Sequence, residues 1–580
     1  MGFLTPNLPT LKMDEWAAYP RGERIRRMAA HWAESGAGTP TVLHAFYLLK
    51  IALYIVGGWL FALTTSGIEG FSKVGQWWVE PIVFEKVVLY TMLFEVIGLG
   101  CGFGPLNSRF WPPMGSILYW LRAGTIRLPP WPNRIPLTRG TTRTPIDVAL
   151  YAALLVLLLV ALVSDGTGTI SALDTAIGLL PLWQILAILV VLAVLGLRDK
   201  VIFLAARGEV YGGLTLVFLF AGTDIIVGAK LVMLLIWVGA ATSKLNRHFP
   251  FVIASMLSNN PFIGSKWIKR RLYTRYPDDL RPGHLANVIA HFSTAIEMLV
   301  PLVLLFSHGG WPTAVAAFIM IVFHLNIVFA IPMGVPLEWN VFMIFGMLSL
   351  FVGHADIGVF DLHNPIPALL LFAVMVACIV TGNVAPHKVS FLPGMRYYAG
   401  NWDTSLWCIK PSAQEKMEAT LVAIPYMPKA QLEKFYSNAE RAEISKHLGF
   451  AFRAMFATGR AYFTLLDRLI PLDQQDDYVI EDGERIATFA IGWNFGDGHL
   501  HNEQLMAALQ QRCGFEPGEV RALMIDGQPI HRQQMQYRLV DAASGELESG
   551  HFDIRELVCR QPWEADVPVH VHSSGHLGVT

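Results

Sequence analysis

Ionisable side chains stand inside the long apolar runs of this sequence of 580 residues. Lys230 and Lys244 belong to the run "IIVGAKLVMLLIWVGAATSKLN", and Lys244 stands near its end. The next apolar run, "HLANVIAHFSTAIEMLVPLVLLF", carries His291 and, near its middle, Glu297. An ionisable group at membrane depth costs at least a few kcal/mol, so by default it indicates a functional site.

Two further apolar runs carry polar groups. The run "IVFHLNIVF" contains His324 and Asn326, and "LEWN" opens another run. A lysine, a carboxylate and two histidines that converge from three spans would move protons as general acids and bases. A desolvated lysine can also act as a base, whereas an arginine cannot. We therefore predict a catalytic set of Lys244, Glu297, His291 and His324, and a substrate-binding set of Lys230, Asn326, Glu338 and Asn340.

Each of these residues also has a purely structural interpretation, which the sequence leaves open. Lys244 at the end of a span would be an anchor whose ammonium reaches the headgroups. Lys230, deeper in the same helix, would pair with Glu297 or Asp224. His324 would be a hydrogen-bonded core histidine. Lys230 and Lys244 share one helix face to within about 40° at 3.6 residues per turn, so that face of the span is polar.

The composition places most of the chain in a membrane. Of all residues, 53% are hydrophobic and 15% are charged, and the mean hydropathy is +0.43, whereas soluble proteins carry about 25% charged residues. The deficit of charge falls between about Thr41 and Gly382. The net charge of −1 gives no sign of a nucleic-acid partner.

The apolar runs predict about ten spans, because a helix needs about 20 apolar residues to cross the hydrocarbon. Lys and Arg collect in the N-terminal arm and in the loops after residues 103 and 245. By the positive-inside rule these segments are cytoplasmic. An even number of spans then places both termini on the cytoplasmic side of the cell membrane. The expected spans are 43–65, 78–103, 146–165, 176–197, 203–222, 225–243, 285–306, 312–332, 338–354 and 364–382.

The expected fold is a polytopic α-helical membrane protein with a C-terminal α+β soluble domain. Residues 1–40 form a cytoplasmic arm, and 41–383 form the transmembrane domain with an interfacial loop at 246–282. Residues 384–580 form the cytoplasmic domain, where "RIATFAIGWNFG" and "EVRALMIDG" predict strands and "AASGE" a hairpin turn. His499 and His501 there have the spacing of metal ligands on a strand, but no third ligand follows, so we predict no metal site.

The order of the polar spans resembles the membrane domain of vitamin K-dependent γ-carboxylase and its bacterial relatives, the HTTM superfamily. "GAATSKLN", "HFSTAIEMLVPLVLLF" and "IVFHLNIVF" carry the resemblance, within about residues 230–351. It implies that Lys244 is the base of a "KL" motif and that His324 is the histidine of an "FH" motif. Relatives have an Asn-His pair where this chain has "AARGEVYGG", so coupled epoxidation and carboxylation is not implied. Over its full length the chain is similar to an uncharacterised actinobacterial transmembrane family, in which "PGMRYYAGNW" is a typical junction.

Three functions fit these observations. The first is a membrane enzyme that acts on a lipid or quinone-like substrate between the sixth and ninth spans. The second is a non-catalytic scaffold or lipid-binding subunit whose cytoplasmic domain docks a protein partner. The third is a transporter, which ranks last because the sequence shows no inverted repeat. The sequence indicates no particular cofactor, and its predicted partners are the bilayer and a lipid-soluble ligand.

Overall fold

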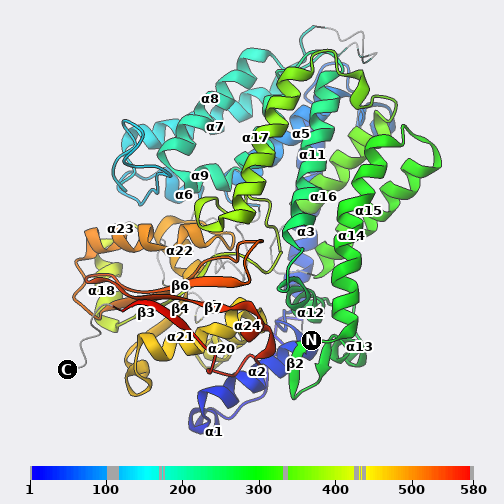
Figure 1. Cartoon of the computed structure of the whole chain (residues 1–580). Helices are drawn as coiled ribbons and strands as arrows, with labels where there is room; N and C mark the ends of the chain where they lie inside the picture. The colour runs from blue at the N-terminus through cyan, green and yellow to red at the C-terminus, as the bar shows by residue number, and fades with distance from the viewer. Residues whose placement is uncertain are drawn as a thin grey trace.

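The computed structural model describes residues 3–100, 116–168, 177–330, 337–423 and 439–574, with single positions between these ranges. Part of the arginine-rich loop after residue 103 lies outside the described residues. Long apolar helices form the upper part of the molecule, and a sheet with its covering helices forms the lower part (Figure 1).

Within the described residues, six helices are long and apolar enough to cross a membrane. The predicted count of about ten spans is therefore not confirmed. The six are α3 (Thr41–Ala62), α7 (Pro145–Val163), α11 (Asp224–Ser243), α14 (His284–Phe306), α15 (Gly310–Ala330) and α17 (Pro365–Val384).

The other four predicted spans are short or broken. Helix α5 (Pro81–Val96) has 16 residues and α8 (Leu182–Arg198) has 17, so at 1.5 Å per residue each covers only about 25 Å of a hydrocarbon core of about 30 Å. The run 203–222 breaks at Arg207, whose φ of 52° lies in the left-handed region. The pieces of the two broken runs are α9 (Lys200–Ala205), the π-helical turn η4 (Gly208–Gly212), α10 (Gly213–Val217), α16 (Leu337–Met347) and the π-helical turn η5 (Leu348–Gly353).

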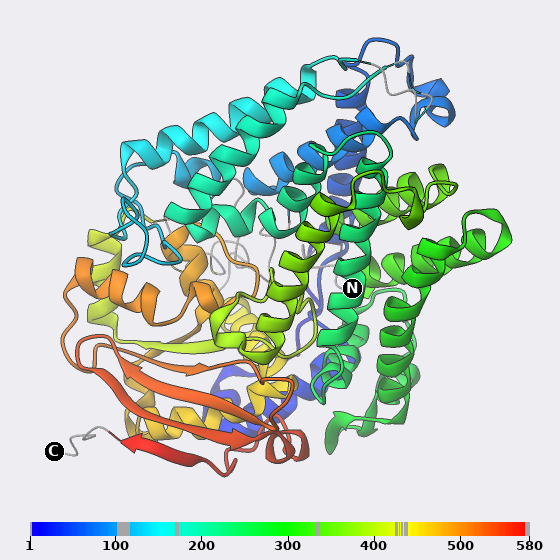
Figure 2. The same cartoon turned by 45° about the horizontal axis from the view of Figure 1, so that its top comes forward.

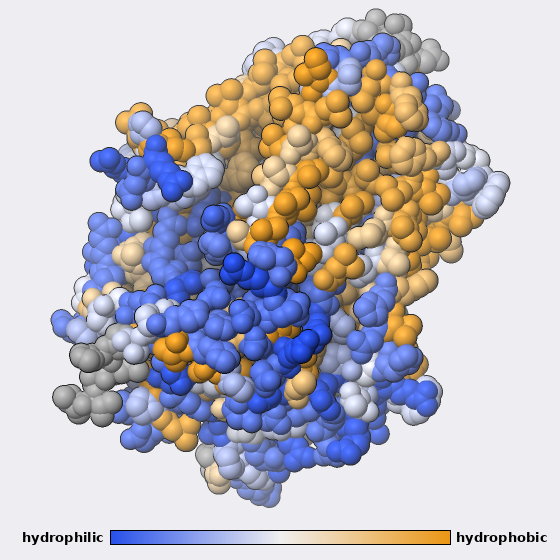
Figure 3. Space-filling view, in the orientation of Figure 1, coloured by the Kyte–Doolittle hydropathy of each residue, from blue (hydrophilic) through white to orange (hydrophobic). Residues whose placement is uncertain are grey.

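Helix α11 is the inner helix of the bundle. In its apolar stretch 83% of the residues are buried, against 22–39% in the other five long helices. It packs against α14 and α17. The outer helices expose large apolar side chains such as Leu53, Phe292 and Phe318. The helices of the upper part that face the viewer form the apolar surface in Figure 3. Polar side chains on α11 therefore face protein, not lipid.

The C-terminal part contains a six-stranded antiparallel sheet in the order β4-β3-β5-β6-β7-β8 (Figure 2). The predicted hairpin is confirmed, since β6 and β7 pair across residues 542–544. "RIATFAIGW" was predicted as a strand, but it forms α22 (Gly483–Ile491), whose first turn is capped by the Asp482 carboxylate. The strands are β3 (Thr404–Ile409), β4 (Val479–Asp482), β5 (Val520–Ile525), β6 (Gln534–Asp541), β7 (Gly545–Asp553) and β8 (His570–Ser574). The helices are α18 (Pro411–Thr420), α20 (Ala439–Met455), α21 (Tyr462–Leu469), α23 (Glu503–Cys513) and α24 (Ile554–Cys559).

The N-terminal arm lies against this C-terminal part. Helix α2 (Arg21–Ser35) packs on α20, beside α1 (Met13–Ala18) in the lower part of Figure 1. The rings of Trp32 and Phe452 are 4.3 Å apart, and Arg21 bonds Asp467 at 2.6 Å. The two ends of the chain are therefore on one side of the helix bundle.

The segment 246–282 divides into buried and exposed parts. Helix α12 (Phe249–Asn259) is buried against α2 and α14. Phe262 and Trp267 are 73% and 61% exposed, and Trp267 lies in the basic helix α13 (Lys266–Arg270). A short pair of strands, β1 (Tyr273–Arg275) and β2 (Asp279–Pro282), then leads into α14.

Candidate functional site

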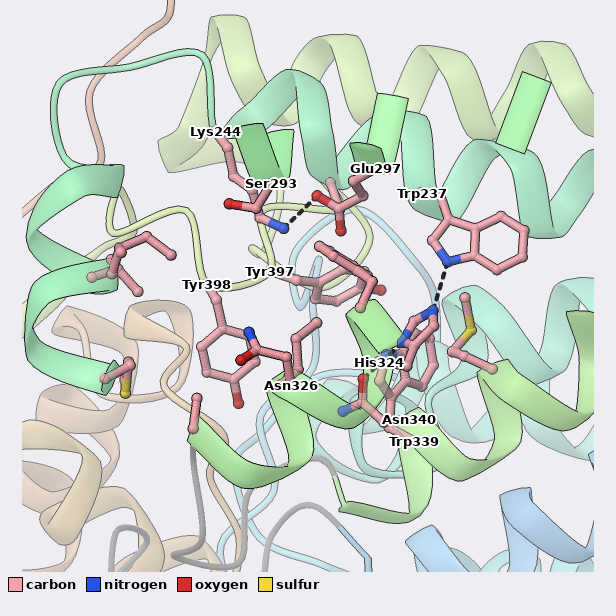
Figure 4. Close-up of a pocket in the computed structure, with 18 of the residues that line it drawn as sticks. Trp237, Lys244, Ser293, Glu297, His324, Asn326, Trp339, Asn340, Tyr397 and Tyr398 are labelled. Atoms are coloured by element: carbon pink, nitrogen blue, oxygen red, sulfur yellow. Dashed lines mark hydrogen bonds and ion pairs between the residues drawn. The ribbon is translucent and has the colours of Figure 1, made fainter. Parts of the chain in front are cut away.

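A cavity of about 120 Å³ lies between α11, α12, α14, α15 and α16 (Figure 4). Its wall is largely apolar, and includes Ile236, Val252, Met256, Phe323 and Met343. Apolar cavities of about this size bind one small ring such as benzene. The cavity can therefore hold a ring or a short stretch of hydrocarbon chain.

An ion pair stands in this apolar wall. The Nζ atom of Lys244 is 2.5 Å from Oε2 of Glu297, and each side chain is only 7% exposed. Lys244 caps the C-terminus of α11, where the partial negative charge of the last carbonyl groups favours a cation. Glu297 comes from the buried face of α14. The two side chains point toward one another in Figure 4.

His324 is held neutral by its two hydrogen-bond partners. The indole Nε1–H of Trp237 donates to Nε2 of His324 at 3.0 Å. An indole only donates, so Nε2 carries no proton. The Nδ1–H then donates to Oδ1 of Asn340, at 2.8 Å. His324 is thus an oriented, neutral part of the wall.

The structure brings five of the eight predicted site residues to this cavity: Lys244, Glu297, His324, Asn326 and Asn340. His291 instead lines a second, more polar cavity on the other side of Lys244. Glu338 lies about 200° around α16 from Asn340, at about 100° per residue, and it pairs with Lys50 at 3.1 Å.

Lys230 lies at the other end of α11, about 21 Å from Lys244 at 1.5 Å per residue. The expected pairing with Glu297 or Asp224 is replaced by two backbone contacts. Its ammonium donates to the carbonyl oxygen atoms of His354 at 2.8 Å and Ile357 at 2.5 Å. Lys230 therefore holds the chain after η5 and lies away from the cavity.

Sequence reasoning missed Arg207 and the rings around it. The Arg207 guanidinium lies 4.3 Å from the ring centre of Trp339, 5.3 Å from that of Tyr397 and 5.6 Å from that of Phe495. It also bonds Glu209 at 2.7 Å, and the Tyr397 hydroxyl donates to Glu209 at 3.2 Å. Arg207, Trp339, Tyr397 and Phe495 all line the cavity. The signal was an Arg and a Glu inside an apolar run.

The two histidines of the C-terminal part, His499 and His501, have separate partners. Nε2 of His499 is 2.9 Å from the carboxylate of Asp403, whereas Nδ1 of His501 is 2.7 Å from Oγ of Ser405. Among the described residues, no three His, Cys, Asp or Glu side chains are grouped to hold a metal ion.

A family model described as "transmembrane protein of unknown function (DUF3556)" matches residues 1–572. The chain belongs to this family. Members are transmembrane proteins, in agreement with the apolar helices. The match shows no link to the HTTM superfamily or to the carboxylases, and no actinobacterial origin. No curated protein and no solved structure matches this chain.

Proposed function

We propose that this protein binds a lipid-soluble molecule, a lipid or a quinone-like compound, in the cavity at Lys244 and acts on it as an enzyme. One observation carries the proposal: a buried ion pair stands in the wall of an apolar membrane cavity. A buried ion pair rarely adds stability over an apolar pair of the same volume. A functional reason for it is therefore favoured.

The geometry gives each residue a role. Lys244 and Glu297 are 2.5 Å apart, so a proton passes between them without any movement of the helices. A substrate that carries an acidic O–H or C–H group would give its proton to this pair. Asn326 offers an amide to a polar group of the substrate, and His324 orients Asn340 and Trp237 around it.

A specific observation favours a second candidate, a non-catalytic lipid-binding subunit or scaffold. Both ring nitrogen atoms of His324 are engaged, and Lys244 and Glu297 bond each other. Such a site is preorganised to hold a ligand without chemistry. The C-terminal domain would then dock a protein partner.

We place the protein in the cell membrane as a multi-pass protein with both termini in the cytoplasm. The distribution of Arg and Lys supports this side. The packing of α2 on α20 supports placing both ends on the same side.

Solvent extraction of the purified protein, followed by mass spectrometry, tests ligand binding. Ala240→Leu narrows the cavity, because Ala240 is a lining residue that is 3% exposed, and it should reduce the retained ligand. Lys244→Arg keeps the cation but not the base, since arginine does not release its proton at neutral pH. In proteoliposomes of native lipid extract, chemical conversion of a lipid by the wild type that does not occur with Lys244→Arg supports the enzymatic function. If the wild type retains a ligand but the lipid composition of its proteoliposomes does not change with time, the result supports the non-catalytic lipid-binding subunit.

A further inference from the structure

Lys244 stands between two cavities of different character. A second cavity of about 370 Å³ lies on its other side, and Lys244 and Phe249 line both. Its volume falls in the range of ligand sites in proteins, about 300–1,000 Å³. The remaining wall comes from the chain after α11, from α14, from Asn383 at the end of α17, and from the C-terminal domain.

The second cavity has the charge pattern of an anion site. Among the described residues that line it, Lys244, Arg247 and His291 can carry positive charge, and none is acidic. Arg247 and His291 are both solvent-exposed. The rest of the polar wall includes the side-chain amides of Asn246, Asn401 and Gln528, whose N–H groups donate to backbone carbonyl oxygen atoms. The cationic side chains are therefore the donors for an anion. Arginine binds phosphate and carboxylate groups with two parallel N–H bonds, so such a wall favours an anion with several oxygen atoms.

Hydrogen bonds between the helices and the C-terminal part hold the wall of this cavity in place. Nε2 of His248 is 2.8 Å from the Gln528 side-chain oxygen, and Asn401 bonds the Gln528 backbone at 2.6 and 2.9 Å. The amide of Ile530 donates to the Asn383 carbonyl oxygen at 2.8 Å. The cavity is therefore a preformed space where the two parts meet.

The position of the two cavities matches the two ends of an amphiphile. The polar cavity lies at the end of α17, where the apolar surface of the helices gives way to the polar surface of the C-terminal part (Figure 3). The apolar cavity lies on the helix side of Lys244. Among the described residues, only Lys244 and Phe249 line both cavities, so these two side chains lie where the two spaces adjoin.

We propose that the ligand is an amphiphile with an anionic headgroup, a phosphate or a carboxylate. Its headgroup binds Lys244, Arg247 and His291 in the larger cavity, and its hydrocarbon chain enters the smaller one. This inference rests on the proposed function, because it names the class of molecule that the cavity binds. It also places Lys244 between two anions, Glu297 and the headgroup, so arrival of the ligand weakens the ion pair with Glu297.

The test uses the full-length protein in nanodiscs of phosphatidylcholine alone or mixed with phosphatidylglycerol, with native mass spectrometry to count the retained lipids. The wild type should retain phosphatidylglycerol in preference to phosphatidylcholine. Arg247→Gln should weaken that retention about ten-fold, the effect of one charge-assisted contact. Arg275→Gln is the matched control, because Arg275 is an exposed arginine at the end of β1, in the same segment 246–282, and should leave retention unchanged. Both positions are exposed, so the melting temperatures of both variants should equal that of the wild type.

Three other outcomes overturn the inference. Equal retention of both lipids, unaffected by Arg247→Gln, refutes the anionic headgroup but leaves the proposed function intact. Inorganic phosphate that raises the melting temperature in an Arg247-dependent way, with no lipid preference, shows a site for a free anion instead. Retention of neither lipid, with solvent extracts that also contain no bound molecule, contradicts the inference and the proposed function together.

Discussion

Replacing Lys244 by Met should destabilise the protein more than replacing Glu297 by Gln. Lys244 donates a hydrogen bond to the Glu297 carboxylate, so Lys244→Met leaves that carboxylate without this partner in an apolar wall. Breaking a buried pair in this way costs about 3–5 kcal/mol. Lys244 also borders the larger polar cavity, where water can solvate its ammonium. Glu297→Gln should therefore cost less, about 1–3 kcal/mol.

Unfolding in mixed micelles, followed by circular dichroism, measures these differences for both single variants and for the double variant. The double variant removes both charges, so it should be more stable than Lys244→Met alone. The coupling energy of the cycle should be about 2 kcal/mol, within the range for residues in contact. Lys244→Arg keeps the cation and serves as the control. Single costs that simply add in the double variant, or a Lys244→Met variant as stable as the wild type, refute the buried pair as drawn from the geometry.

Three further outcomes are expected. Lys230→Met leaves the carbonyl groups of His354 and Ile357 without their donor, so it should lower the free energy of unfolding by about 1–3 kcal/mol. Ligand retention should stay at the wild-type level, and a loss of retention at unchanged stability would place Lys230 in the site. Burial lowers the pKa of His499, but the hydrogen bond and charge of Asp403 outweigh it and raise the pKa to about 9. The protonated His499 should therefore stabilise the fold by about 3 kcal/mol below pH about 6.5, and this stabilisation is lost as the pH rises through 9. The melting temperature of His499→Gln should fall less steeply than that of the wild type between pH 7 and 10, and an equally steep fall would assign the effect to another group. A green fluorescent protein fused after residue 580 should fluoresce, and an alkaline phosphatase at that place should be inactive, whereas the opposite pair of results would invert the topology.

The membrane character and the central site residues could be predicted because they depend on local signals. Apolar runs of about 20 residues indicate membrane-spanning helices, and a carboxylate in hydrocarbon requires a cation near it. That requirement left Lys230 and Lys244 as possible partners of Glu297, and the order of the polar spans favoured Lys244, which lies at one cavity with Glu297 in the structure.

The remaining residues depended on facts that a sequence does not carry. Glu338 and Asn340 are two positions apart, so they face different sides of α16, and only the packing decides which side meets the cavity. Arg207, Tyr397 and Phe495 come from distant segments that meet only in the folded chain. The count of about ten spans is not confirmed, because a buried apolar helix of 16 residues, such as α5, has the same local composition as a helix long enough to cross a membrane.

The packing of α2 on α20 has a consequence for how the protein is made. Roughly 400 residues separate these helices, and ribosomes add about 5–20 residues per second. For about 20–80 s after its synthesis, α2 lacks helix α20, which covers its apolar face of Met28, Trp32 and neighbouring residues in the folded protein. An amphipathic helix in that situation binds the nearest apolar surface, and for a membrane protein this is the bilayer interface. The N-terminal arm therefore stays beside the membrane during insertion, until the C-terminal part of the chain is made and packs on α2.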